Sequence, residues 1–283
     1  MYPLISVIIP AHNSAKTIGV AIKSMIMQTY PNLEIIIIDD NSADNTKEIA
    51  ADFISKNDNV KYYPLPYNDP HRFNRYGLNI NAGWMARNYG FEKVNGDWIT
   101  FQDADDASLI NRIEVQYNLA VEYNSSHVCI DWQRFKEEYV GKKLDVEKVF
   151  SEKSDIIVPS DYILELVKET KGSLMNILGG AHQLIPFSVK KSRFVHKLFF
   201  KSWVSYPGAA NSPLVKRELI EKIKFRPLNA RIWPSQRGRG ADRDFNFAVA
   251  EAFGDSISVK LPLYLWRVKT QHPDYEGYGG YIL

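Results

Sequence analysis

Three carboxylates stand within four residues, at Asp103, Asp105 and Asp106, directly after the apolar run Trp98–Phe101. Like charges held this close repel one another and raise each other's pKa. A hard divalent cation such as Mg2+ or Mn2+ relieves this repulsion, because it prefers carboxylate and phosphate oxygens as ligands. Helix capping is an alternative, since the residues from Ala107 onward are expected to begin a helix. Capping accounts for one or two of the carboxylates but not all three, so the residues alone leave both explanations open.

The elements that precede this cluster alternate between strands and helices. Strands are expected over 5–9, 33–38, 60–63 and 98–102, and helices over 15–28, 45–56 and 79–91, with Asn45 and Glu48 as a capping box. Strands that are apolar throughout predict a parallel sheet with helices on both faces. Such sheets bind ligands at the carboxyl ends of their strands. The polar pairs His12-Asn13 and Asp39-Asp40 stand at two of these ends, and the acidic cluster stands at a third.

The pattern weakens after residue 124, but it continues without a linker or an internal repeat. Strands are expected over 128–135, 212–215 and 257–265, and helices over 161–170, 218–223 and 242–253. The second half is therefore expected to extend the first, which makes residues 1–283 a single domain.

Composition narrows the class of protein. Apolar residues make up 45% of the 283, which indicates a globular chain, and the net charge of +2 argues against a nucleic-acid partner. Cys129 is the only cysteine, so neither an intramolecular disulfide nor a zinc–thiolate site can form. This use of cysteine fits a reducing compartment. The first residues show no signal peptide, and no apolar stretch reaches the roughly 20 residues of a membrane span. We therefore expect a cytoplasmic protein.

Four sequence blocks resemble the family 2 glycosyltransferases, which have the GT-A fold. They are Val7–Asn13, Gln28–Thr46, Asn81–Asn88 and the Asp103–Asp106 segment, which stands as the family's DxD motif. His12 departs from the tyrosine that is usual in the first block. The resemblance implies an α/β, Rossmann-like, mostly parallel central sheet flanked by helices, with a C-terminal acceptor-side extension. Residues 1–124 would then form the nucleotide-sugar-binding half and residues 125–283 the acceptor-binding half.

The family's reaction moves a sugar from a nucleotide-sugar, here expected to be a UDP-sugar, to an acceptor hydroxyl with inversion. A divalent cation, Mn2+ or Mg2+, holds the donor diphosphate. By this resemblance Asp103 lies near the ribose and the metal, and Asp105, with or without Asp106, ligates the metal. His272 is a further metal-ligand candidate, although its spacing from Arg267 differs from the family pattern.

The same resemblance assigns the nucleotide site. The base would lie against Pro10, Ala11, His12 and Asn13. Asp40 would accept a hydrogen bond from uracil, and Asp39 would be structural. Arg87 would bind the diphosphate, because its guanidinium fork suits phosphate oxygens. An ordinary surface ion pair is the alternative for this arginine.

The catalytic base is expected in the segment Gly238–Phe245, which resembles the family's Gly-Glu-Asp-x-Asp-Phe with Ala241 in place of Glu. Asp242 aligns with the general base, and a helix N-terminus would keep its carboxylate ionised. An N-cap role is the alternative for Asp242, and Asp244 is the next candidate for the base.

Two other functions and one surface question remain open from the sequence. A nucleotidyltransferase would carry a Gly-rich basic loop after the first strand, whereas Pro10–Ala15 contains no glycine; a non-catalytic binding module would not need the acidic motif. The acceptor would be a glycan, a lipid-linked sugar or a protein. Basic and aromatic residues alternate over Phe187–Trp203. This pattern fits peripheral contact with a membrane surface, but an amphipathic helix packed on the core by its aromatic face is the favoured explanation.

Overall fold

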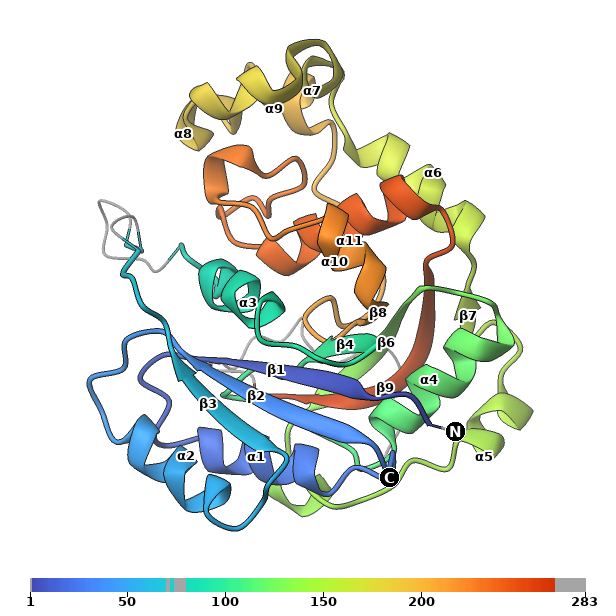
Figure 1. Cartoon of the computed structure of the whole chain (residues 1–283). Helices are drawn as coiled ribbons and strands as arrows, with labels where there is room; N and C mark the ends of the chain where they lie inside the picture. The colour runs from blue at the N-terminus through green and yellow to red at the C-terminus, as the bar shows by residue number, and fades with distance from the viewer. Residues whose placement is uncertain (1, 70–71, 74–79, 268–283) are drawn as a thin grey trace.

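The computed structural model describes residues 2–69, 72–73 and 80–267 (Figure 1). Its strands form one sheet in the order β3-β2-β1-β4-β8-β6-β9-β5, with β7 paired to β9. Four parallel strands come first in the chain: β1 (Ile5–Ala11), β2 (Leu33–Asp39), β3 (Val60–Pro64) and β4 (Trp98–Phe101). The chain leaves β1 toward β2 on one side and returns to β4 on the other. Such a reversal opens a crevice at the carboxyl ends of the strands.

Side chains from alternate positions of β1 and β2 enter two different cores, because successive residues of a strand point to opposite faces. Val7 and Ile35 pack with α1 (Ile18–Ile26), α2 (Thr46–Ile54) and α4 (Arg112–Glu122). Ile8 and Ile36 pack with α3 (Trp84–Phe91), α10 (Arg217–Lys222) and α11 (Ala241–Phe253). Both faces of these strands are therefore buried, as their uninterrupted apolar sequence predicts.

The second half of the chain adds its strands to the same sheet. β8 (Leu214–Lys216) is antiparallel to both β4 and β6 (His127–Arg134), and β9 (Ile257–Trp266) is parallel to β6. The short strands β5 (Ala107–Ser108) and β7 (Ile157–Val158) are antiparallel to β9. Pro262 lies where the β6–β9 register shifts, since proline has no N–H for the ladder. The sheet is thus mostly parallel on its β3 side and mixed on its β9 side.

The remaining helices follow β6, and several of them are short. α5 (Val146–Glu152) and α6 (Ser160–Thr170) precede α7 (Ser173–Leu178), α8 (Phe187–Lys190) and α9 (His196–Phe200). The 3-10 helices are η1 (Glu137–Tyr139), η2 (Gly179–Leu184) and η3 (Leu228–Ala230). In Figure 1, α7, α8 and α9 lie together at the top of the molecule, away from the sheet. Among the described residues, no helix has both the length and the apolar character that crossing a bilayer requires.

Three sequence-based expectations about local structure were wrong. Ala107 and Ser108 begin no helix but pair with β9, and α4 starts only at Arg112, so the acidic cluster caps no helix. The side chain of Asn45 makes no capping hydrogen bond to α2; Asp44 Oδ1 instead accepts from the Thr46 N–H at 3.1 Å. The segment 187–203 is not one amphipathic helix, because turns separate α8 from α9.

Candidate active site

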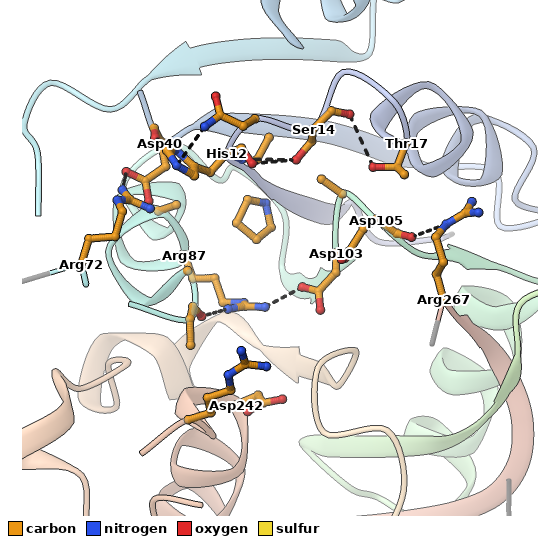
Figure 2. A pocket seen from close by; sticks show the side chains of 18 of the residues that line it. His12, Ser14, Thr17, Asp40, Arg72, Arg87, Asp103, Asp105, Asp242 and Arg267 are labelled. Atoms are coloured by element: carbon orange, nitrogen blue, oxygen red, sulfur yellow. Dashed lines mark hydrogen bonds and ion pairs between the residues drawn. The ribbon is translucent and has the colours of Figure 1, made fainter. Parts of the chain in front are cut away.

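A cleft of about 810 Å3 opens at the carboxyl ends of β1, β2 and β4 and is closed on its far side by the start of α11. In Figure 2, His12 and Asp40 lie above Arg87 and Asp103, and Asp242 lies below them. Nine residues that the sequence placed in the donor, metal or base site line this cleft: Pro10, Ala11, His12, Asn13, Asp40, Arg87, Asp103, Asp105 and Asp242. The predicted metal ligand His272 lies outside the described residues.

The three clustered carboxylates have different surroundings. One carboxylate oxygen from each of Asp103, Asp105 and Asp106 lies within 4.8 Å of the other two. Asp106 is buried, and its oxygens accept from the backbone N–H of Arg267 at 2.7 Å and the hydroxyl of Tyr264 at 2.9 Å. Burial first, and the two neighbouring carboxylates second, raise the pKa of Asp106 to about 8. Asp106 is therefore part of the cleft's support, whereas Asp103 and Asp105 line the cleft itself.

Asp103 is fixed from two sides. Its Oδ1 accepts from Arg87 Nη2 at 2.6 Å, and its Oδ2 accepts from Asn211 Nδ2 at 2.8 Å. Burial raises the pKa of Asp103, and the Arg87 guanidinium opposes that rise. Arg87 is only 5% exposed and also donates to the Ala82 carbonyl at 2.6 Å. The surface ion pair considered for Arg87 is therefore wrong: the residue is a buried wall of the cleft.

Gly83 makes room for this arginine. It precedes α3 with φ of +68°, a backbone conformation that side chains disfavour. A Cβ added at Gly83 would lie 2.9 Å from Arg87 Nη1. A glycine here thus allows the guanidinium to reach Asp103.

The acidic cluster fits a divalent cation by the chemistry of its donors. Carboxylate oxygens from two or three aspartates are the ligands that Mg2+ and Mn2+ prefer. Arg267 Nε donates to the Asp105 carbonyl at 2.9 Å, which fixes the backbone of the motif. Across residues 2–69, 72–73 and 80–267, no other group of three or more His, Cys, Asp or Glu side chains has spacing suited to a metal.

The two aspartates that follow β2 have separate environments. Asp39 is structural, as expected, because its carboxylate accepts from the Ser42 N–H at 3.1 Å, from the Ser42 hydroxyl at 2.5 Å and from the Tyr62 hydroxyl. Asp40 is 2% exposed at the cleft wall, and its carboxylate forms an ion pair with Arg72. A nucleotide base that forms a hydrogen bond with Asp40 must therefore share this carboxylate with Arg72.

His12 and Asn13 hold the ends of β1 and β2 together. His12 Nδ1 lies 2.6 Å from the Asp40 carbonyl, which can only accept, so Nδ1 carries the proton and Nε2 accepts from Asn13 Nδ2 at 3.2 Å. Asn13, at φ of +50°, accepts from the Ala43 N–H at 2.8 Å through Oδ1, and its own N–H donates to the Ser42 hydroxyl at 2.9 Å. These two side chains thus shape the rim where the nucleotide base is predicted to lie.

Asp242 and Asp244 both lie in the first turn of α11 but face different surroundings. Asp242 is half-buried at the cleft, and the helix N-cap is Gly240, so the N-cap role considered for Asp242 is wrong. Asp244 is fully buried and accepts from the N–H groups of Ile232 and Trp233 and from Arg226 Nε, at 2.7, 2.9 and 2.7 Å. These bonds occupy both oxygens of Asp244, so the alternative that Asp244 is a base is wrong.

Several cleft residues had no role in the sequence analysis. Lys16 and Arg239 are exposed basic residues on opposite walls, and no ion pair is seen for either among the described residues. Arg239 stands between Gly238 and Gly240, three residues before Asp242, and that position was the available sequence signal. Arg267, which supports the acidic motif, was noted only as a neighbour of His272. The cleft thus contains cationic side chains that can oppose the charge of a diphosphate: Lys16, Arg72, Arg87, Arg239 and Arg267.

The family model for glycosyl transferase family 2 matches residues 6–156, more than half of the chain. The chain belongs to this family. Among curated relatives, the Escherichia coli UDP-Glc:alpha-D-GlcNAc-diphosphoundecaprenol beta-1,3-glucosyltransferase WfgD is 28% identical over 203 residues, which cover 71% of this chain and 69% of WfgD. Two further curated relatives, 37% and 31% identical, are matched over only 55% and 42% of their lengths. The chain thus spans about half the length of these two relatives.

Solved structures show the same fold. Staphylococcus aureus TarS 1-349, in a complex with UDP-GlcNAc, superposes with a TM-score of 0.55 at 17% identity, covering 95% of this chain and 59% of that one. The mannosyltransferase PcManGT from Pyrobaculum calidifontis, in a complex with GDP-Man and Mn2+, gives 0.52 at 16% identity, covering 96% and 59%. This family 2 chain has the GT-A fold, as its sequence predicted.

Proposed function

We propose that this protein is an inverting glycosyltransferase that moves a sugar from a UDP-sugar to an acceptor hydroxyl in glycan assembly. One observation carries the proposal. Asp103 and Asp105, the two carboxylates proposed as metal ligands, line the same cleft as Asp242, which comes from the other half of the chain. Family membership argues against the nucleotidyltransferase alternative. In this assignment residues 1–124 bind the donor and residues 125–283 supply the acceptor side.

The reaction is a single displacement at the anomeric carbon. The acceptor oxygen forms its bond to that carbon while the bond to the nucleoside diphosphate breaks, through an oxocarbenium-like state. Asp242 takes the proton of the acceptor hydroxyl, since it reaches the cleft and lies at a helix N-terminus that stabilises its charge.

The leaving diphosphate gains negative charge, which the cleft must compensate. A divalent cation held by Asp103 and Asp105 would stabilise that charge as a Lewis acid. Lys16, Arg87 and Arg239 line the same cleft and would bind the phosphate oxygens. Asp103 thus links the predicted metal site to Arg87 through their ion pair.

The donor assignment rests on Asp40. A carboxylate at this position can accept the N–H of uracil, and His12 and Asn13 hold the Asp40 loop in place. A GT-A neighbour holds UDP-GlcNAc and another holds GDP-Man, so the fold itself accommodates both nucleotides. We propose uracil because Asp40 is already at the cleft wall.

The acceptor is proposed to be a lipid-linked sugar. WfgD, which aligns with 71% of this chain, is named for transfer to a sugar on diphosphoundecaprenol. Such an acceptor lies at a membrane, which requires a membrane-facing surface on the enzyme.

Donor turnover tests the proposed activity. The purified chain with Mn2+ should release UDP from at least one of UDP-Glc, UDP-GlcNAc and UDP-Gal, faster than it releases nucleotide from GDP-Man or dTDP-Glc. EDTA should stop this release. If no sugar nucleotide is turned over, with or without a lipid-linked acceptor, the proposed activity is wrong. Turnover of the GDP-sugar alone would overturn only the donor assignment.

A further inference from the structure

The helical cap, defined as residues 173–204 with α7, η2, α8 and α9, has an apolar core of its own. Met175, Phe187, Phe199 and Phe200 are buried together there. Phe187, Phe199 and Phe200 therefore pack in a core within the cap, not on the cores that cover the sheet. Only some of the apolar side chains of the cap contribute to this core, and the others lie outside it.

A second apolar set of the cap faces solvent. Phe194 is 92% exposed in the turn between α8 and α9, Leu184 is 81% exposed at the end of η2, and Ile177 is 75% exposed in α7. Of the thirteen large apolar side chains that are exposed among the described residues, six belong to the cap: Ile177, Leu184, Val189, Phe194, Leu198 and Val204. Exposed apolar residues gathered on one part of a surface mark an interaction site more often than scattered ones do.

The charged residues of this region are all basic. Between Glu169 and Glu218 the sequence has eight Lys and Arg residues and no Asp or Glu, although the whole chain has a net charge of only +2. The rest of the chain is therefore net negative. Four of these basic side chains are exposed within the cap itself: Lys191, Arg193, Lys197 and Lys201.

We propose that the helical cap docks the protein on an anionic membrane surface. Basic residues near the lipid headgroups are attracted by negative surface potential, and neighbouring apolar side chains enter the headgroup–acyl boundary. Phe194 directly follows Arg193 and precedes Lys197, so the most exposed apolar residue lies among the cap's cations. The cap thus combines electrostatic attraction and apolar insertion, the two contributions on which reversible membrane binding depends.

The combination favours a membrane over other anionic partners. A nucleic acid would bind the cations but would have no use for Ile177, Leu184 and Leu198, which are aliphatic. An acidic protein could use both, but the exposed apolar residues stand on turns and short helices that lie together at one end of the molecule (Figure 1). Such an end suits shallow insertion into a fluid surface.

Vesicle sedimentation tests the proposal without donor, acceptor or metal, so its outcome is independent of the glycosyltransferase activity. The full chain should sediment with vesicles that contain phosphatidylglycerol and not with vesicles of phosphatidylcholine alone. Raised salt should weaken this binding, because it screens the charges. Equal partition to both vesicle types, or to neither, would overturn the proposal.

Charge reversal has a matched control. Lys191→Glu, Arg193→Glu and Lys197→Glu together should lower binding to the anionic vesicles at least a hundredfold, since each cation contributes roughly fivefold. The control triple carries the same change in net charge on exposed residues before and within α5, namely Lys142→Glu, Lys143→Glu and Lys148→Glu. If both triples lose binding equally, net charge and not the cap attracts the protein, and the proposal fails.

Site-specific labelling tests insertion itself. Cys129 is the only cysteine and is fully buried, so a Phe194→Cys variant can be labelled at one position with an environment-sensitive fluorophore. Its emission should shift to the blue with anionic vesicles. The same label on Val121→Cys, which replaces an apolar residue 60% exposed in α4, should not respond. Light scattering that shows the cap forming a dimer instead, with no shift at residue 194, would overturn the membrane assignment.

Discussion

The two aspartates of the first turn of α11 show how surroundings divide chemically identical side chains. Asp242 lines the cleft, whereas both oxygens of Asp244 are occupied by hydrogen bonds inside the fold. A base must present an ionised oxygen to the acceptor hydroxyl, so of these two aspartates we propose Asp242 for that role.

Replacing Asp242 with asparagine should therefore separate transfer from donor binding. We expect Asp242→Asn to lower kcat for transfer by roughly two to four orders of magnitude, because the acceptor hydroxyl keeps its proton. UDP binding should stay the same or become tighter, since the charge of Asp242 raises the pKa of Asp103 in the neighbouring acidic cluster. Transfer kinetics and UDP titration calorimetry measure the two effects.

Asp244→Asn is the structural counterpart of that variant. It leaves the Arg226 guanidinium without its buried carboxylate, which should lower the free energy of unfolding by about 3 kcal/mol. For Asp242→Asn, the variant described first, near-normal transfer would show that the catalytic base is a different residue.

The sequence identified nine of the residues that line the cleft but not their partnerships. Motif resemblance placed Asp40, Asp103 and Asp242 in one site, and all three line the cleft. The pairing of Asp40 with Arg72 could not be predicted, because it joins two loops through side-chain geometry that no spacing encodes. The inward position of Asp106 likewise depends on Tyr264, which is 158 residues away in the chain.

At the scale of elements, His127 connects three parts of the second half. It lies in β6, and its ring nitrogens bond with Ser256 before β9 and with Asn246 in α11, at 2.8 and 3.0 Å. Burial lowers the pKa of His127 from 6.5 to about 4. The ring therefore stays neutral in the folded protein at pH values where the unfolded chain binds a proton.

This difference predicts a stability that falls with acid. Below about pH 6.5 the unfolded state takes up the proton and the folded state does not, so folding loses about 1.4 kcal/mol per pH unit down to about pH 4. From about pH 7 to about pH 5 the loss is about 2 kcal/mol. A His127→Gln variant lacks this contribution, so the difference in unfolding free energy between the two proteins should shrink by that amount as the pH falls.

Urea unfolding of both proteins at the two pH values measures the change. The neighbouring Asp131, whose pKa burial raises to about 6, acts in the opposite direction but is common to both proteins and cancels. A stability difference that stays constant with pH would mean that His127 is protonated in the fold or is accessible to water.

Long apolar elements could be predicted from the sequence, and several of the shortest elements could not. β1 and β2 are each buried over nearly their whole length, so their local pattern is sufficient. β5 has two residues and exists only because β9, more than 150 residues later, pairs with it. The four-residue helix α8 and the five-residue α9 are likewise fixed by the core of the cap rather than by local periodicity.

At the scale of the whole molecule, the cleft joins both halves of the chain. Asp40, Asp103 and Asp105 come from the first half, while Asp242 and Arg239 come from the second. The antiparallel pairing of β8 with β4 and β6 holds the two halves in one sheet. A donor bound between them would therefore stabilise the entire fold rather than one loop.

Ligand-dependent unfolding tests this coupling and the metal site together. UDP with Mn2+, at about 100 times its Kd, should raise the free energy of unfolding by about 2.7 kcal/mol, because it binds only the folded chain. EDTA should remove most of this gain if the cation bridges the diphosphate to Asp103 and Asp105. Asp105→Asn should show little metal-dependent gain, since a carboxylate ligand is lost, whereas Asp58→Asn, an exposed aspartate far along the chain from the acidic motif, should respond like the parent. Stabilisation by UDP that is the same in EDTA, or the same in both variants, would show that the acidic cluster does not bind the donor through a metal.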